Sequence, residues 1–478
     1  MPELILAIDV GTTSTRAALT APDGRFAGLA AEPLTSNAPA PGKVEQDAEA
    51  VWRATMTAIS RALAGAGRAP SDIAAIGVTT QRASAVIWDR STGAPLSPLV
   101  VWSDLRGATR ATELASAGFM LAPQQAATKL ESMFASVKRP AGEVAWGNID
   151  SYLIFRLTGG GAHVTDRSQA WPCGYLGLPE LGWNDPLIEH QRLDPGTFPN
   201  LVDTWGELGA TSTEVFSAEI PITTDIADQQ SALTAHGDAV GTAKFTFGTS
   251  GTFDLATGQT FLFPGPSTPP LVVSSVAGDT RFCLEGMVLS AGSAIDWVRA
   301  AFALGDHGEF ESLAGSVNDT AGAAFLPALQ GLGAPRGDPN RRASLTGLNA
   351  SVGREHLARA ALESVAFRAR EIIDHIYSVT DFAPAPALGV DGGLSRSRVF
   401  LQILADLTGR PVRRHATPEA TLLGVAIAAG RGARLLTESD IDAMVRFEAP
   451  VAPMLAADEA AERFAAWRAQ VYGSTGHA

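Results

Sequence analysis

A short apolar strand, a turn of Gly and Thr residues and a second strand follow one another twice in this chain. The first strand covers residues 4–10, the turn has the letters DVGTT at residues 9–13, and the second strand covers residues 15–20. The same order returns at residues 243–257, around the turn GTSGT at residues 248–252. Because the unit repeats after about half the chain, we expect two similar lobes with a cleft between them.

Strand and helix signals alternate through the rest of the chain, which indicates the α/β class. The expected helices cover residues 46–66, 354–377, 398–407, 420–429 and 458–472, and further strands cover residues 25–32, 73–79 and 388–391. The 478 residues allow two or three domains. Since the second unit starts at residue 243, we predict an N-terminal domain at residues 1–236 and a C-terminal domain at residues 237–478.

Charge and cysteine content argue against several classes of protein. A net charge of −14 is unfavourable for binding nucleic acid, whose phosphates need a basic surface. Two cysteines, Cys173 and Cys283, are too few for a disulfide framework or a Cys-rich metal site. No apolar run approaches the ~20 residues that span a bilayer, and the N-terminus reads as a strand rather than a signal peptide. We therefore expect a cytoplasmic protein with no membrane or nucleic-acid partner.

The Gly/Thr turns and two carboxylates suit phosphoryl transfer. Such a turn presents backbone N–H groups and hydroxyls to a phosphate, and Asp9 at the strand end can hold Mg²⁺. The acceptor hydroxyl also needs a base, and Asp228 in the letters IADQQ is the candidate. Each feature alone has another explanation, the loop as an ordinary turn and Asp228 as the cap of a helix. The motifs of P-loop kinases, zinc proteases and serine hydrolases are absent from the sequence.

Taken in order, the motifs resemble those of the FGGY carbohydrate kinases, and within that family they are most similar to glycerol kinases. The similar segments are IDVGTTSTR at residues 8–16, VEQD at 44–47, TTQR at 79–82, VW at 101–102, HVTD at 163–166, DQQ at 228–230, FGTSG at 247–251, GLGAP at 331–335, DP at 338–339 and VDGG at 390–393. The resemblance covers nearly the whole chain. It implies two ribonuclease-H-like lobes, of the actin and hexokinase type, with ATP and substrate in the cleft between them.

The resemblance also implies roles for individual residues. Asp228 would be the catalytic base, and Asp9 would hold Mg²⁺ through water. ATP would be bound by Asp9, Gly11, Thr12, Thr13, Arg16, Gly248, Thr249, Gly292, Gly392, Gly393 and Ser397. A small polyol or sugar would be bound by Gln81, Arg82, Ala83, Trp102, Asp104, Gln124, Asp228 and Gln229. Gly424 would permit close packing of its helix.

Two positions depart from the glycerol kinase pattern. Glycerol kinases carry an acidic residue where this chain has Ala83, and a Tyr where it has Gln124. A missing carboxylate removes a charge-assisted hydrogen bond to a hydroxyl, and the smaller Ala83 opens volume. We therefore expect that a longer polyol or a ketopentose such as xylulose can replace glycerol. Arg82 and Gln229 do not match the xylulose kinase pattern, whereas the segment from Trp102 through Asp104 to residue 106 is similar to the sugar-kinase pattern.

Three further expectations concern the protein as a whole and one lysine. A nucleotide-gated regulatory protein on the same scaffold is the alternative to a kinase, but it would have no need of a base beside ligands for substrate hydroxyls. The resemblance suggests a homodimer or homotetramer. Lys129 matches a family loop by position, and we interpret it as a solvated side chain.

Overall fold

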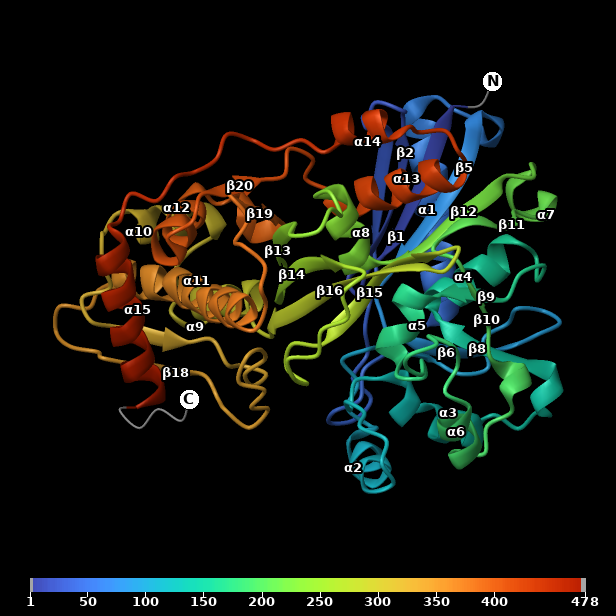
Figure 1. The fold of residues 1–478 in the computed structure, drawn as a ribbon, viewed down its shortest axis with the longest axis horizontal. Coiled ribbons are helices and arrows are strands. Elements are labelled where there is room, and N and C mark those ends of the chain that lie inside the picture. Colours follow the sequence, from blue (N-terminus) through green and yellow to red (C-terminus); the bar gives the residue numbers. More distant parts are fainter. Residues whose placement is uncertain (1–2, 474–478) are drawn as a thin grey trace. The chain divides into compact units, whose positions relative to one another are not determined.

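The computed structural model describes residues 3–473, which form two compact α/β units (Figure 1). Unit 1 holds the chain up to Gly237 together with Leu271–Arg281 and Ala420–Val445. Unit 2 holds Asp238–Pro270, Phe282–Glu419 and the chain from Arg446 onward. The first crossing between units therefore falls one residue beyond the expected boundary, but a single cut does not separate the units, because two later segments return to unit 1.

The central sheet of unit 1 has six strands in the order β11-β12-β5-β1-β2-β3. These strands are β1 (Leu4–Val10), β2 (Ser14–Thr20), β3 (Phe26–Pro33), β5 (Ile73–Thr80), β11 (Trp205–Ala210) and β12 (Pro221–Ala227). Strands β1, β5 and β12 run parallel, and Val10 pairs with Thr80, which pairs with Ala227. The chain therefore leaves these three strands at the same edge of the sheet.

Helix α1 (Ala48–Ala66) begins two residues later than expected. Gln46 belongs to the short strand β4 (Glu45–Gln46), and Asp47 is the N-cap, whose carboxylate accepts hydrogen bonds from the N–H groups of Glu49 and Ala50. The helix packs against β2 and β3. This contact is close, since a Cβ at Gly28 would lie 2.2 Å from the carbonyl oxygen of Ala62.

Helix α13 (Ala420–Gly432) explains why the late segment belongs to unit 1. It packs against α8 (Asp228–Ala235) and the sheet strands β1, β5 and β12. A Cβ added at Gly424 would lie 1.7 Å from the carbonyl oxygen of Ser231, and one at Gly77 would lie 2.9 Å from that of Val425. Small residues let the backbones approach this closely, so α13 is part of the core of unit 1. The close packing expected for Gly424 is present.

A second layer of unit 1 contains the four-stranded sheet β4-β7-β6-β8 and the pair β10-β9. Its strands are β6 (Ala85–Asp89), β7 (Leu99–Val100), β8 (Val144–Asn148), β9 (Val164–Asp166) and β10 (Asn200–Val202). The remaining helices of unit 1 are α2 (Ala108–Ser116), α3 (Leu130–Ser136), α4 (Ile149–Leu157), α5 (Arg167–Cys173), α6 (Asp185–His190), α7 (Thr213–Phe216) and α14 (Glu438–Met444), with 3-10 turns η1 (Pro70–Asp72), η2 (Ala126–Thr128), η3 (Ala141–Glu143) and η4 (Pro195–Thr197). Cys173 is buried, as expected for a small apolar side chain.

The sheet that carries unit 2 has the order β15-β16-β14-β13-β19-β20. Its strands are β13 (Ala243–Phe247), β14 (Gly251–Gly258), β15 (Pro270–Val276), β16 (Asp279–Val288), β19 (Leu388–Asp391) and β20 (Val412–Arg414), and the hairpin of β17 (Ala324–Leu326) and β18 (Ser344–Thr346) stands apart. Residues 271–281, at the tip of the β15–β16 hairpin, count with unit 1. Strands β13 and β19 run parallel, with Thr246 opposite Asp391, so their ends also share one edge.

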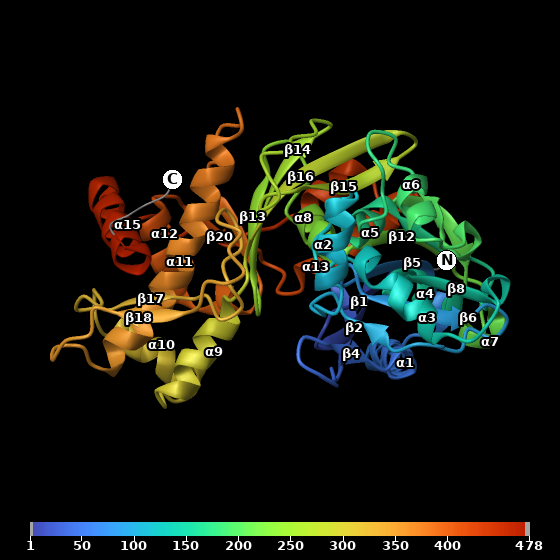
Figure 2. The same cartoon turned by 90° about the horizontal axis from the view of Figure 1, so that it is seen from below.

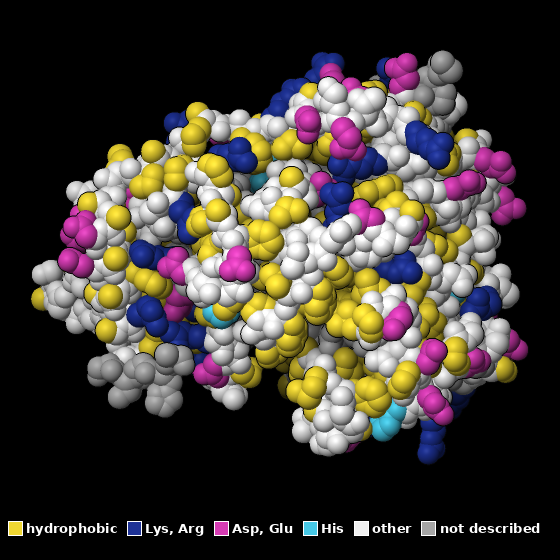
Figure 3. Space-filling view, in the orientation of Figure 1, with side chains coloured by type: hydrophobic (Ala, Val, Ile, Leu, Met, Phe, Trp, Pro, Cys, Tyr) yellow, Lys and Arg dark blue, Asp and Glu magenta, His cyan; other side chains and the backbone are white. Residues whose placement is uncertain are grey.

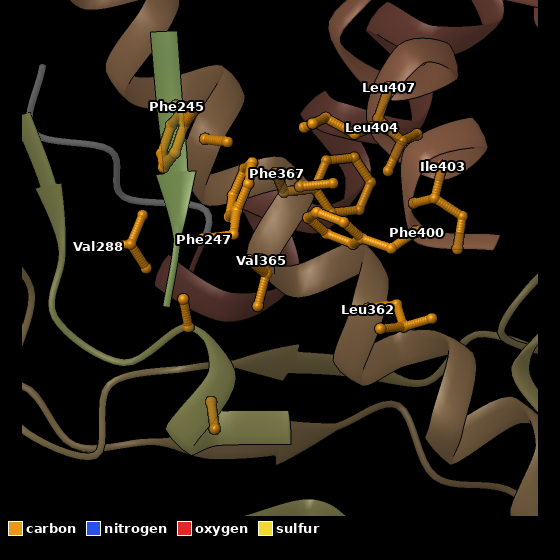
Figure 4. Close-up of a cluster of buried hydrophobic side chains, with 14 of the residues drawn as sticks. Phe245, Phe247, Val288, Leu362, Val365, Phe367, Phe400, Ile403, Leu404 and Leu407 are labelled. Carbon is orange, nitrogen blue, oxygen red and sulfur yellow. The ribbon is translucent and has the colours of Figure 1, made fainter. Parts of the chain in front are cut away.

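Helices on this sheet form the apolar core of unit 2. They are α9 (Gly292–Ala301), α10 (His307–Gly315), α11 (Arg354–Ser378), η5 (Gly393–Arg396), α12 (Arg398–Thr408) and α15 (Ala457–Tyr472). Figure 2 shows α11 and α12 side by side. In Figure 4, Phe245 and Phe247 on β13 lie near Phe367 and Phe400. The rings of Phe245 and Phe247 stack with centroids 4.2 Å apart, which anchors the strand that ends at the second Gly/Thr turn.

The surface carries mixed charge. On the face shown in Figure 3, Lys and Arg side chains are scattered among Asp and Glu. Within residues 3–473, no helix combines the length and the apolar character that crossing a membrane requires.

Gly424→Ala is expected to lower the free energy of unfolding by about 1–3 kcal/mol or more, because the new methyl group overlaps the Ser231 carbonyl. The control is Gly65→Ala in α1, where nothing lies within 4 Å of the new methyl group. That variant should be stabilised by about 0.5–1 kcal/mol, since alanine restricts the unfolded chain. Urea unfolding measures both, and equal effects of the two substitutions would contradict the packing assigned to Gly424.

Candidate functional site

The edge where β1, β5 and β12 end gathers the expected residues of unit 1. The turn after β1 closes with a hydrogen bond from the N–H of Gly11 to the carbonyl of Ser14, at 3.0 Å. Asp9 is buried at the strand end, and its carboxylate pairs at 3.3 Å with Arg16, which lies opposite on β2. Thr13, by contrast, has an exposed side chain.

Side chains of this turn and of the loop after β5 form one hydrogen-bonded network. The Thr12 hydroxyl donates to Gln81 at 2.9 Å and accepts from the indole N–H of Trp102 at 3.1 Å. Gln46 donates to the Thr12 carbonyl at 2.7 Å and accepts from the Gln81 amide at 3.2 Å. The structure thus brings together three expected residues, Thr12, Gln81 and Trp102. It adds Gln46, whose only signal in the sequence is its place in the segment VEQD.

Arg82 and Asp228 meet across the ends of β5 and β12. The Arg82 Nε lies 3.5 Å from the Asp228 Oδ1, and both side chains are partly exposed. Asp228 is the first residue of α8 and accepts a hydrogen bond from the N–H of Gln229 at 2.8 Å. The N-cap of this helix is Ala227, so Asp228 does not have the capping role that was the alternative from the sequence.

Ala83 follows Arg82 in an unusual backbone conformation. Its φ is +54°, in the left-handed region, and its side chain is 6% exposed. An L residue is strained in this region, and the strain persists only where the surroundings hold it. The conformation directs the chain from the end of β5 into the loop.

The structure corrects the expectation that Asp104 contacts the acceptor. Asp104 is fully buried, and its carboxylate accepts from the N–H of Val44 at 2.6 Å and from the Arg106 guanidinium at 2.8 Å. Burial alone would raise the pKa of Asp104, but the hydrogen bonds from Arg106 and Val44 outweigh it and hold the pKa below its ordinary value. Asp104 therefore fixes the loop after Trp102 as a carboxylate and has no free face for a substrate.

The interpretation of Lys129 as a solvated side chain is wrong. Lys129 is fully buried at the start of α3, and its ammonium donates to the carbonyls of Val101 at 3.1 Å and Trp102 at 3.4 Å. Burial lowers its pKa to about 8. Lys129 thus fixes the backbone at Val101 and Trp102. Gln124, among the residues that the structure describes, lies exposed before η2 and takes no part in this network.

Unit 2 contains a pocket of about 550 Å³ beside its own Gly/Thr turn. It is lined by Phe247, Gly248, Thr249, Gly292, Ile295, Asp296, His307, Phe310, Glu311, Leu362, Gly393, Leu394, Arg396 and Ser397. The volume lies within the range of about 300–1,000 Å³ that is usual for small-molecule sites. Apolar walls, acidic side chains that can accept from ribose hydroxyls and a glycine turn suit a nucleotide.

Glycines are required where this pocket meets the strands. The N–H of Gly292 donates to the Gly248 carbonyl at 2.9 Å, and a Cβ at Gly292 would lie 2.6 Å from that oxygen. Gly392 has φ +85°, and its Cβ would lie 2.5 Å from the Phe247 carbonyl oxygen, so it packs behind the pocket rather than lining it. Ser397 lines the pocket and also caps α12, while its hydroxyl donates to Glu311 at 2.9 Å.

Three carboxyl groups are buried together in unit 1; of these only Asp166, which lies in the segment HVTD, had a signal in the sequence. Asp225 on β12, Asp166 at the start of α5 and Asp150 on α4 are each fully buried. Burial and the charges of Asp150 and Asp166 raise the pKa of Asp225 well above its ordinary value. Burial also raises the pKa of Asp150, and that of Asp166 to about 6. Asp225 therefore keeps its proton to a higher pH than an ordinary carboxyl group does.

A nucleotide-sized pocket in one unit and an ion-paired carboxylate among hydrogen-bonding side chains in the other are what a small-molecule kinase needs. Comparison with known proteins defines the kind of kinase. The chain belongs to the FGGY family of carbohydrate kinases: residues 4–235 match the N-terminal domain of that family and residues 243–433 its C-terminal domain. It is an ATP-dependent kinase of a sugar or polyol.

Relatives and solved structures agree with this assignment. The chain is 37% identical over 492 residues to the glycerol kinase of Geobacter sp. (strain M21), with 99% of each chain covered, and 35% identical over 488 residues to that of Thermus brockianus, with 99% and 98% covered. The glycerol kinase of Plasmodium falciparum with ADP has a TM-score of 0.90 at 25% identity and 99% coverage of both chains. The xylulose kinase of Rhodospirillum rubrum has a TM-score of 0.82 at 26% identity and 98% coverage of both. The expected two-lobed fold of the actin and hexokinase type is confirmed.

The carboxyl cluster predicts a pH dependence of stability. Groups whose pKa is raised in the folded state stabilise it below their unfolded pKa of 3.8, and this stabilisation is lost as the pH rises through the folded values, about 6 for Asp166 and higher for Asp225. Asp225→Asn removes one of these carboxyl groups. From pH 5 to pH 8 the free energy of unfolding of this variant should therefore rise, relative to that of wild type, by roughly 1–2 kcal/mol. Urea unfolding at both pH values measures this gain. The exposed control Asp194→Asn should show none, and parallel pH curves for Asp225→Asn and wild type would contradict the prediction.

Proposed function

We propose that this kinase transfers the γ-phosphate of ATP to a primary hydroxyl of a small polyol, with Asp228 as the catalytic base. The observation that carries the proposal is the Arg82–Asp228 pair at 3.5 Å, next to Gln229 and beside the network of Gln81, Thr12 and Trp102. A base among groups that bind hydroxyls serves an acceptor, whereas a regulatory ATPase has no use for it. The glycerol kinases among the relatives support a polyol.

In the proposed reaction the acceptor oxygen attacks the γ-phosphorus as its proton passes to Asp228. A bond from this oxygen to phosphorus forms, the bond from phosphorus to the ADP oxygen breaks, and Asp228 becomes neutral until it releases the proton to water. Arg82 holds the Asp228 carboxylate in place, and with Gln229 it orients the acceptor hydroxyls, while the buried Gln81 holds Thr12 and Gln46 beside them. Trp102 offers an apolar ring face to the C–H surface of the acceptor.

The nucleotide is assigned to unit 2 and its metal to Asp9. Gly248 and Thr249 would face the phosphates, and Ile295, Phe310 and Leu362 would enclose the base. Mg²⁺ is commonly held by one or two carboxylates together with phosphates and waters. Asp9 fits this role, since its carboxylate is held at the turn by Arg16. When bound with ATP, Mg²⁺ would neutralise charge on the transferred phosphoryl group.

We propose that the acceptor binds beside Ala83. A methyl group stands there instead of the carboxylate expected in a glycerol kinase, so one charged ligand is missing and space is gained. A longer polyol is therefore proposed as an acceptor, and a ketopentose is the second candidate, supported by the structural similarity to a xylulose kinase. We also propose a cytoplasmic location, which suits two free cysteines and ATP as co-substrate. A homodimer or homotetramer is proposed from the family resemblance.

Asp228→Asn is expected to reduce acceptor-dependent ADP release by at least ~100-fold while nucleotide affinity stays within about twofold, because the amide cannot take the proton. ADP release over a panel of polyols and ketopentoses, together with calorimetric titration of ATP, measures both. The matched control is Asp185→Asn, which changes the exposed first residue of another helix, α6, and should keep full activity. Turnover of wild type that no acceptor increases would refute the proposed function.

Ala83→Glu is expected to shift the ratio of kcat/KM for glycerol against a five-carbon polyol by roughly 10-fold in favour of glycerol. The new carboxylate would supply a charge-assisted hydrogen bond and occupy volume. Ala83→Gln controls for volume without charge. Ala83→Gly controls for the strained backbone, because glycine adopts a φ of +54° without strain. An unchanged ratio in Ala83→Glu would show that this position does not select the acceptor.

A further inference from the structure

The first turn of α5 lies against the strand end that carries the base. Asp166, the N-cap, accepts hydrogen bonds from the N–H groups of Ser168 at 3.0 Å and Gln169 at 2.9 Å. Such a cap fixes the backbone at the start of the helix. The side chains of Ser168 and Gln169 are buried, so the groups that they contact are held in a single arrangement.

This turn contacts each of the three residues that precede Asp228. The N–H of Asp166 donates to the Asp225 carboxylate at 2.9 Å, the Gln169 amide donates to the Ile226 carbonyl at 3.3 Å, and the N–H of Ala227 donates to the Ser168 hydroxyl at 2.8 Å. The end of β12, directly before the proposed base, is therefore held by α5 as well as by the sheet.

Gln169 makes a second contact, to the neighbouring strand. Its amide donates to the Thr80 hydroxyl at 3.0 Å, and Thr80 is the last residue of β5, directly before Gln81 and Arg82. The Asn148 side chain donates to the backbone carbonyl of Gln169 at 3.2 Å. Gln169 is fully buried. One side-chain amide thus joins the end of the strand that carries Arg82 to the end of the strand that carries Asp228.

We propose that Gln169 is a positioning residue for phosphoryl transfer, whose amide keeps Arg82 and Asp228 in register. The inference rests on the proposed function, in which Asp228 is the base. The backbone ladder ends at the pair Thr80 and Ala227, and beyond it the chain turns into a loop on one side and a helix on the other. The side-chain contacts of Gln169 add to the backbone hydrogen bond from the Gln81 N–H to the Val10 carbonyl in placing this loop, and a misplacement of about 1 Å can lower a rate by roughly 100-fold.

The test replaces the amide without changing the volume. Gln169→Met should lower kcat roughly 10- to 100-fold, with the KM for ATP unchanged. Gln169→Glu sets a carboxylate oxygen against the Ile226 carbonyl and should lower kcat as well, which provides a second variant if the first does not fold. The matched control is Gln191→Met, another buried glutamine, which bonds to Tyr175 and to the Ala127 carbonyl. It should lose stability while kcat stays within about twofold.

Two readouts separate positioning from a general loss of structure. In the double variant with Asp228→Asn, the loss from Gln169→Met should disappear, because Gln169 acts through Asp228; additive losses would overturn the inference. Amide hydrogen exchange at residues 81–84 and 228–231 should accelerate in Gln169→Met and not in Gln191→Met. Unchanged exchange there would overturn the inference whether or not the enzyme is active. An inactive wild type would instead refute the proposed function, and wild-type kcat in Gln169→Met would refute only the role of Gln169.

Discussion

The parallel pairing of β1, β5 and β12 is the constraint on which the acceptor side of the site depends. Parallel strands end at one edge of a sheet. Because Val10 pairs with Thr80 and Thr80 with Ala227, the segments that follow the three strands begin side by side. The Gly/Thr turn after β1, the loop after β5 and a helix that starts with a carboxylate all begin at this edge. A shift by one residue would turn Thr80 and its neighbours to the opposite faces of the sheet.

Such a sheet must be covered on both faces, and this requirement explains the discontinuous unit 1. The face toward α8 and α13 tolerates almost no side-chain volume, since Gly77 and Gly424 both stand where a Cβ would collide with backbone. A helix from residues 420–432 completes the core of a unit whose strands come from the first half of the chain. Sequence reasoning cannot place that helix from local pattern, because its small apolar residues suit any tightly packed position.

The sequence was informative where chemistry is local and uninformative where burial decides. The Gly/Thr turns and the residues Gln81 and Arg82 come after strands that periodicity predicted. The strand before Asp228 was not predicted, and Asp228 was singled out by motif order alone. Lys129 was misjudged because a charged side chain is normally solvated, and Asp104 because its motif resembles a substrate-binding pattern. Only tertiary contacts show that each is surrounded by partners. Gln169 gave no signal for the same reason: an amide becomes informative only when its two partners come from separate strands.

The same contacts indicate how this scaffold can change its acceptor without changing its chemistry. The backbone of the proposed acceptor site is held by three hydrogen-bonding side chains: Lys129 on the Trp102 carbonyl, Gln46 on the Thr12 carbonyl and Gln169 on the ends of two strands. Ala83 is different, because its conformation is set by its neighbours and its methyl group makes none of these hydrogen bonds. In the proposed function, a substitution at residue 83 would therefore alter volume and charge beside the acceptor, while Asp228, Arg82 and the Gly/Thr turn would keep their contacts. The proposed function thus assigns acceptor choice and phosphoryl transfer to separate sets of contacts within unit 1.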